Sequence, residues 1–68
     1  MDEEAKDIVI NTINFILDSH YDDYENSIKE FQKVNNLEEN GTLNIETAQL
    51  LQKLAYDKYL DIINSYIF

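Results

Sequence analysis

The stretch of sequence that decides the fold reads IKEFQKVNNLEENGTLNIETAQLL and covers residues 28–51. Apolar residues recur at helical spacing on both sides of Gly41, the only glycine of the chain. A glycine adopts a positive φ without a Cβ clash, and Asn40 before it tolerates that conformation better than most residues. The stretch therefore predicts a helix over about 24–35, a tight turn over 38–41 and a second helix after the turn.

The rest of the chain extends this pattern to three helices, the first of them over about residues 2–19. Short polar side chains suited to N-caps precede the other two, Asp22 or Asp23 for the second and Asn44 for the third. The stripe expected to be buried on the first helix comprises Val9, Ile13, Ile16, Leu17 and His20. That of the last helix comprises Ile45, Ala48, Leu51, Leu54 or Ala55, Tyr59, Ile62 and Tyr66. We expect an all-α, three-helix bundle that forms a single domain over residues 1–68, with an extended C-terminal helix.

The composition restricts the classes of function. The chain carries five Lys and Arg residues against fourteen Asp and Glu residues, a formal net charge of −9. Binding to nucleic acid or to an anionic membrane surface depends on Lys and Arg, so neither is expected. The absence of cysteine excludes disulfides and thiolate metal sites. We interpret the acidity mainly as a source of solubility.

Residues of the central stretch follow a spaced pattern of apolar, Gln, Gly and Thr positions, made up of Ile28, Phe31, Gln32, Leu37, Gly41, Leu43, Thr47 and Leu51. With this spacing the stretch resembles the core of the peptidoglycan-binding domain family, over about residues 8–55. The resemblance implies a three-helix module that binds cell walls, as in phage endolysins and bacterial wall hydrolases. The first connection, 21–26, is shorter than in the family and lacks its glycine, and residues 56–68 lie beyond the usual end of such a domain.

The resemblance implies binding rather than catalysis. The expected function is non-catalytic recognition of peptidoglycan, as the targeting subunit of a phage or bacterial lytic enzyme. Aromatic rings with a polar edge suit the apolar faces of sugars, and Tyr21 and Tyr24 flank the first connection. The alternative for these two residues is a loop position for Tyr21 and half-buried core for Tyr24. The candidate ligand-binding residues are Tyr21, Tyr24, Gln32, Asn35, Asn40 and Thr42.

Two other groups of residues give only weak evidence of a catalytic or metal site. His20 is the only histidine, and no Ser, Cys or second His completes a catalytic set around it. Alternating oxygen-bearing residues over 36–40, followed by Gly41, are similar to the first half of an EF-hand calcium loop. The twelfth position is Thr47, however, where a calcium loop needs a bidentate Glu. We therefore expect no enzymatic activity, no metal and no cofactor.

The C-terminal residues are apolar around most of the predicted helix. A three-helix core buries only one face, so Leu60, Ile63, Ile67 and Phe68 are expected to remain exposed. An exposed apolar patch usually marks an interface, and these four residues are therefore candidates for an oligomer interface. The expected partners are a cell-wall polymer and either a second copy of the chain or a catalytic partner chain.

The sequence also bears on where the protein acts. No basic segment precedes an apolar run, and no apolar stretch reaches membrane-spanning length. We expect a protein made in the cytoplasm without a signal peptide and without membrane insertion, which acts at the bacterial cell wall once a lytic event releases it. The alternative function is a small acidic protein–protein interaction module, or an inhibitor that mimics an anionic ligand in a basic groove.

Overall fold

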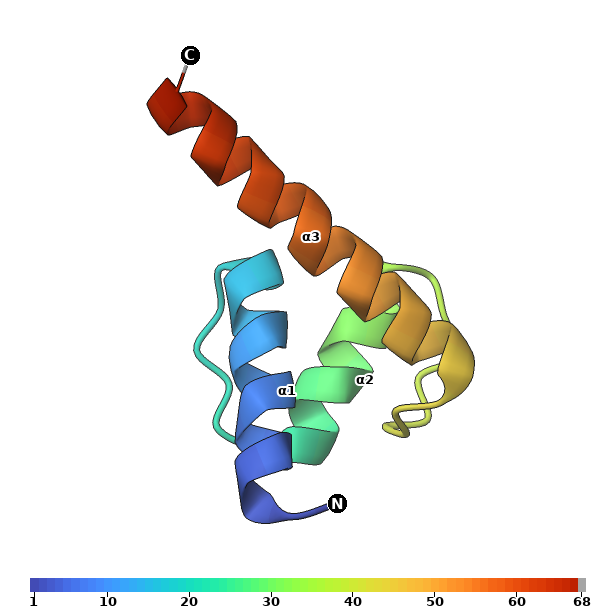
Figure 1. Cartoon of the computed structure of the whole chain (residues 1–68). Helices are drawn as coiled ribbons and strands as arrows, with labels where there is room; N and C mark the ends of the chain where they lie inside the picture. Colours follow the sequence, from blue (N-terminus) through green and yellow to red (C-terminus); the bar gives the residue numbers. More distant parts are fainter. Residues whose placement is uncertain (68) are drawn as a thin grey trace.

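The computed structural model describes residues 1–67, and these form three helices and no strand. Helix α1 spans Glu3–Leu17, α2 spans Tyr24–Val34 and α3 spans Ile45–Ile67. Helix α1 packs against both of the others, and α3 continues beyond the body as a projecting rod that carries the C-terminus (Figure 1). This arrangement confirms the prediction of an all-α, three-helix fold with a long C-terminal helix.

Each helix begins at a side-chain oxygen that accepts a backbone N–H from the first turn. The bonds run from Ala5 N to Asp2 Oδ1 at 2.8 Å, from Asn26 N to Asp23 Oδ2 at 2.9 Å and from Thr47 N to Asn44 Oδ1 at 2.9 Å. Asp23 rather than Asp22 therefore caps α2. A cap of this type contributes about 1 kcal/mol, so short-range sequence signals set the points where the helices begin.

The core is formed by one or two apolar side chains from each helix. Ile13 of α1 and Ile28 and Phe31 of α2 are completely buried, and Leu51 of α3 is 6% exposed. Partly buried residues pack around this centre, namely Val9, Ile16, Leu17, Tyr24, Leu43, Leu50 and Leu54. The predicted stripe of α1 up to Leu17 and the Leu51 and Leu54 positions of the α3 stripe thus lie in the core, whereas Ile45, which its spacing placed in that stripe, is 76% exposed at the start of α3.

The end of α1 differs from the prediction. Asp18 adopts a left-handed conformation with φ 53°, and its N–H bonds to the carbonyl of Asn14, so the helix ends at Leu17. His20 lies beyond this end and is exposed. Its assignment to the buried stripe was wrong because the helical periodicity stops before the residue is reached. His20 also does not close α1, since Asp18 takes that position.

The second half of α3 also differs from the prediction. Tyr59 is 56% exposed, Ile62 38% and Tyr66 87%, although the periodicity had placed them in the core. With a rise of about 1.5 Å per residue, 23-residue α3 is roughly 12 Å longer than 15-residue α1, and its last turns run past the end of α1 (Figure 1).

Of the four residues proposed for an oligomer interface, Leu60 and Ile67 are exposed, Ile63 is half-buried and Phe68 lies outside the described residues. Within residues 1–67, no helix has both the length and the hydropathy that a membrane span requires.

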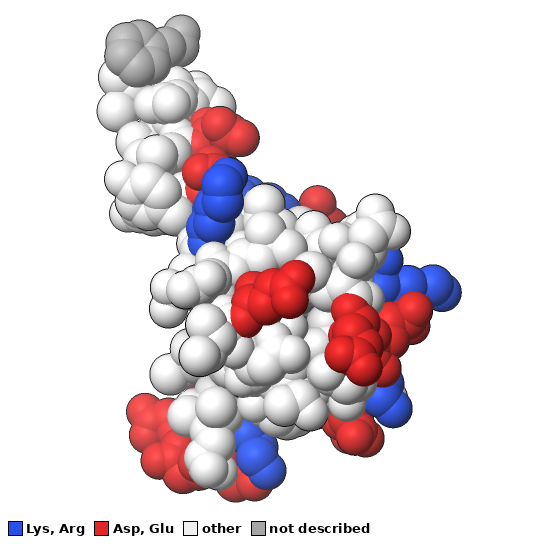
Figure 2. Space-filling view, turned by 90° about the vertical axis from the view of Figure 1, so that its right-hand side faces the viewer, with Lys and Arg blue, Asp and Glu red and all other residues white. Residues whose placement is uncertain are grey.

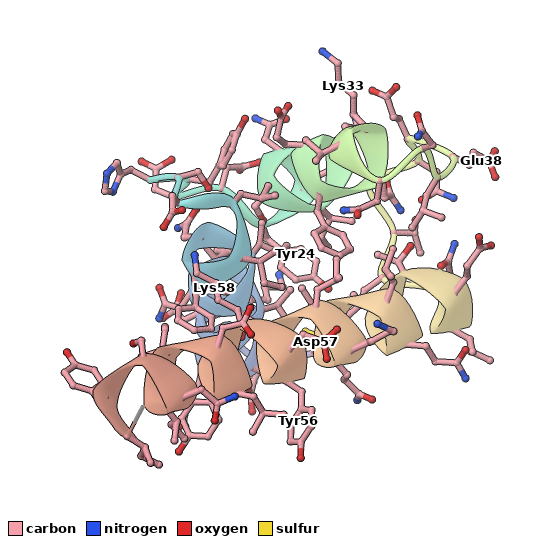
Figure 3. The ribbon with its side chains drawn as sticks, turned by 90° about the horizontal axis from the view of Figure 1, so that it is seen from above. Tyr24, Lys33, Glu38, Tyr56, Asp57 and Lys58 are labelled. Atoms are coloured by element: carbon pink, nitrogen blue, oxygen red, sulfur yellow. The ribbon has the colours of Figure 1, made fainter. Side chains whose placement is uncertain are left out.

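A lysine from α3 completes the C-terminal end of α1. The Lys58 ammonium donates to the carbonyl of Phe15 and to Asp18 Oδ1, the latter at 3.0 Å, and lies 5.0 Å from the centre of the Phe15 ring. Figure 3 shows this side chain reaching from α3 to the end of α1. The last turn of α1 has no basic residue of its own, so α3 supplies the cation that favours the negative end of the helix dipole.

Candidate functional site

A buried glutamine organises the turn between α2 and α3. Gln32 is completely buried, and its Nε2 donates to Asn40 Oδ1 at 2.9 Å, to the Thr42 carbonyl at 3.1 Å and to Thr47 Oγ1 at 3.1 Å. Its Oε1 accepts from the Gly41 backbone N at 3.0 Å. An amide has two N–H groups, so two of the three acceptors share one hydrogen. We call these five residues the Gln32 bracket.

The bracket brings into contact residues that occupy separate positions of the sequence pattern. Gln32, Gly41 and Thr47 are the polar and glycine positions of that pattern, and all three meet in one network. Thr47 is 1% exposed, and its hydroxyl accepts a hydrogen bond from Gln32. A buried network whose members are all paired fixes one local geometry, because each unpaired member would be costly.

The bracket divides the predicted ligand-binding residues. Asn40 and Thr42 are exposed on the turn, so a ligand can reach them. Gln32 is sealed beneath them, and it can position the turn but cannot touch a ligand. Asn35 is half-buried, and its Nδ2 donates to the carbonyl of Phe31 on its own helix at 2.8 Å.

The two tyrosines lie at the other end of α2. Tyr24 begins the helix, about 12 Å along the axis from Gln32 at 1.5 Å per residue. Its half-buried ring packs against the core and lies 5.6 Å from the Lys6 ammonium; Figure 3 shows it directed into the space between the helices. Tyr24 is therefore core, and the structure does not bring it together with Asn40 and Thr42.

The Asn14 side chain forms hydrogen bonds with the connection between α1 and α2 that contains Tyr21. The Asn14 Nδ2 donates to the carbonyl of Tyr21 at 2.8 Å, and Asn14 Oδ1 accepts from Tyr21 N at 2.9 Å and from Ser19 Oγ at 2.8 Å. Partial burial, then the charge of Glu30 and a hydrogen bond to it, raise the pKa of the Tyr21 phenol. Sequence reasoning missed Asn14, because a polar residue on a helix gives no local sign of a contact seven residues away.

The half EF-hand pattern is used for a different purpose. Asn40 Oδ1, which a calcium loop would direct at the ion, accepts from Gln32 Nε2 and from Thr42 N at 2.9 Å. Within residues 1–67, no three His, Cys, Asp or Glu side chains are grouped so that they could hold a metal ion. Asn40 Oδ1 therefore serves the turn.

An apolar groove runs between α1 and α3. It consists of two adjoining hollows of about 490 and 420 Å³ that share Ile8, Thr12 and Ala55. None of the residues that line it is charged: Ile8, Val9, Asn11, Thr12 and Phe15 from α1, Ala48, Leu51, Gln52, Ala55, Tyr56 and Tyr59 from α3, and Leu43 before α3. We call this feature the α1–α3 groove, and sequence reasoning did not find it.

Comparison with known proteins adds nothing to these features. No protein-family model, curated protein or solved structure matches this chain. The likeness to peptidoglycan-binding domains therefore depends on the spaced residue pattern of the central stretch, three positions of which, Gln32, Gly41 and Thr47, belong to the bracket.

Replacement of Gly41 tests the turn on which the bracket depends. Gly41 has φ 72°, and a Cβ there would lie 2.7 Å from Glu25 Cγ and 3.1 Å from Lys29 Cε. Both neighbours are flexible side chains that can move, so the main cost arises from the backbone conformation. We expect Gly41→Val to lower the free energy of unfolding by more than about 1 kcal/mol, because a β-branched residue is strained at positive φ.

The matched control is Gly41→Asn, which meets the same neighbours but tolerates the left-handed conformation. Urea denaturation followed by circular dichroism measures both variants. An equal loss for Val and Asn would mean that crowding, and not the positive φ, makes glycine necessary.

Proposed function

We propose that this chain is a non-catalytic module that binds the bacterial cell wall, as the targeting subunit of a phage or bacterial lytic enzyme. The observation that supports the proposal best is the Gln32 bracket. The polar positions of the peptidoglycan-binding pattern, 32, 41 and 47, form one closed hydrogen-bond network. Apolar matches alone are common among helical proteins, whereas a buried Gln that ties a glycine turn to a threonine is a more specific arrangement.

The bracket also presents polar groups outward on a fixed support. Asn40 Oδ1 is turned inward to Gln32 and Thr42 N, while the residue itself is exposed, so its amide N–H₂ is available as a donor. Thr42 adds an exposed hydroxyl two residues later. A rigid turn loses little conformational entropy on binding, and donors of this type suit the hydroxyl and amide oxygens of a glycan-peptide polymer.

The charge around the turn is consistent with a wall ligand that carries amines. Glu38 and Glu39 precede Asn40 on the turn, Glu25 lies beside Gly41 on α2, and Glu46 belongs to the first turn of α3, all of them exposed. The Lys29 side chain also lies beside Gly41, so carboxylates outnumber the ammonium at this edge. Carboxylates at the edge of a binding surface attract cationic groups and are screened by salt. Free amino groups on wall peptides are complementary to this edge, whereas phosphate-rich wall polymers are repelled.

Sedimentation with purified Gram-positive cell walls tests the proposal. We expect the wild-type chain to sediment with the walls and to release no soluble wall fragments. At high salt, where the attraction between the added carboxylate and wall amines is screened, Asn40→Asp combined with Thr42→Val should weaken binding about tenfold, the effect of losing one or two hydrogen bonds. Asn40→Asp keeps the oxygen that accepts from Gln32, so the bracket and the thermal stability should persist.

The matched control is Asn64→Asp, which adds the same charge at an exposed site far along α3. It should bind walls as the wild type does. A wild-type chain that stays in the supernatant overturns the proposal. If the chain at the same time binds the basic groove of another protein, the function is that of an acidic interaction module.

A further inference from the structure

We propose that the α1–α3 groove receives the projecting end of α3 from a second copy of the chain, so that two copies form a symmetric pair. This proposal does not depend on cell-wall binding, because it concerns a face that contains neither Asn40 nor Thr42. It follows from an uncovered apolar stripe, from the distribution of charge and from the shapes of the groove and the helix end.

The stripe on α3 continues past the point where α1 ends. Ala55 and Tyr59 line the groove, and Ile63 and Tyr66 follow at i+4 and i+7 from Tyr59. Residues at this spacing share one face of a helix, so the face that closes the groove is also the face that projects. Lys58 marks the level of the α1 terminus, and the residues after it extend roughly 13 Å further at 1.5 Å per residue.

The exposed apolar area on this face supplies a large part of what a dimer interface buries. Tyr56 is 62% exposed, Tyr59 56% and Tyr66 87%. At roughly 200 Å² per aromatic side chain, the three tyrosines alone expose about 400 Å². Ile8 and Ile67, 60% and 66% exposed, extend the patch at its two ends. A stable interface buries about 800 Å² per partner, whereas the largest patch on a monomer is typically about 300–600 Å².

Charge is kept away from this face, although the chain carries a net charge of −9. No residue that lines the groove is charged, and neither is any residue over 62–67. Asp57 and Asp61 stand two residues on either side of Tyr59, which places them on the opposite face of α3. In Figure 2 the projecting end is uncharged along one side, and charged side chains lie along the other. Two copies can therefore meet on this face with their acidic surfaces turned away.

The shapes of the two parts are complementary in one arrangement. If two α3 helices pair antiparallel about an axis near Tyr59, Ile63 of one copy faces Ala55 of the other, and Tyr66 faces Gln52. The small side chain at Ala55 leaves room for a large one, and the exposed Gln52 amide can pair with the Tyr66 hydroxyl, which needs a partner once it is buried. The contacts are reciprocal, as the symmetry of an isologous dimer requires.

Equilibrium sedimentation of the full chain tests the pairing. We expect a monomer–dimer equilibrium whose association strengthens with salt, since screening weakens the repulsion between two acidic copies. Tyr66→Asp should raise the dissociation constant at least about tenfold, because it buries a charge in an apolar groove. Asn64→Asp adds the same charge on another face of α3 and should have little effect. Tyr66 is 87% exposed in the single chain, so neither variant should impair folding.

A charge pair tests the register of the two helices. Gln52→Lys combined with Tyr66→Asp places opposite charges across both copies of the proposed contact, and association should return to within about threefold of the wild type. Failure of this rescue would overturn the antiparallel pairing. A wild-type chain that stays monomeric at high concentration and high salt would overturn the proposal as a whole, and so would equal effects of Tyr66→Asp and Asn64→Asp. Cell-wall sedimentation of Tyr66→Asp distinguishes the two proposals. Because Asn40 and Thr42 are unchanged in this variant, it should still bind walls when pairing is lost.

Discussion

Phe31→Ala is expected to leave the domain largely unfolded. Phe31 is completely buried, in one core cluster with Ile13 of α1, Ile28 of α2 and Leu51 of α3. Replacing such a residue with alanine costs about 3–5 kcal/mol. The total stability at 0.05–0.15 kcal/mol per residue is roughly 3–10 kcal/mol for a chain of this length. Circular dichroism at 25 °C should show loss of most of the helical signal, or a transition with a much lower urea midpoint.

Phe15→Ala is the matched control, because Phe15 is 37% exposed and contacts the Lys58 side chain at the surface. Its cost should be about 1 kcal/mol, in the range of an ordinary surface-near substitution. Equal costs for Phe31→Ala and Phe15→Ala would show that the stability of the domain does not depend on the centre described above.

Gln32→Leu is expected to have the second largest effect, although leucine is a better apolar residue for a buried site. The substitution leaves the Gly41 N–H and the Thr47 hydroxyl without their partner, and it removes one of the two donors to Asn40 Oδ1. An unsatisfied buried polar group costs about 1–3 kcal/mol, and Thr47 has no access to solvent that would replace the bond. We expect a total loss of about 3 kcal/mol, measured by urea denaturation.

Gln49→Leu provides the comparison, since Gln49 is exposed on α3. This substitution should change the free energy of unfolding by less than about 0.5 kcal/mol. In the Gln32 variant, the amide resonance of Gly41 should also shift, because its hydrogen bond is lost. If Gln32→Leu is as stable as the wild type, water replaces the glutamine side chain in the turn, and the bracket does not stabilise the turn.

Short-range signals predicted most of the framework. Asp23 and Asn44 each cap a helix because a short side-chain oxygen can reach the first turn, an interaction contained within four residues. Asp2 caps α1 in the same way, although the prediction had begun the helix at this residue. The positive φ of Gly41 follows in the same way from its lack of a Cβ. Burial of Ile13 and Phe31 was predictable because both lie on the apolar stripe of an amphipathic helix.

Features that depend on the relative lengths of helices were not predictable. The stripe of α3 keeps its period to the end, so the sequence alone gives no sign that the covering helix stops near Lys58 and leaves Tyr66 exposed. The α1–α3 groove has the same origin, since it depends on where two helices separate. Among the candidate ligand-binding residues, the pattern grouped Gln32 with Asn40 and Thr42, but it did not distinguish the buried support from the exposed surface.

The contact that Lys58 makes also affects the cooperativity of the fold. Its partners, the carbonyl of Phe15 and the carboxylate of Asp18, lie forty or more residues earlier in the chain. The last turn of α1 therefore acquires its stabilising cation only when α3 has docked, and α3 in turn has α1 as its principal neighbour. The stability of α1 and the docking of α3 thus depend on each other. A fragment that ends before α3 lacks both the core residue Leu51 and Lys58, the partner of the α1 terminus. This interdependence favours a single all-or-none transition, as is usual for a small domain.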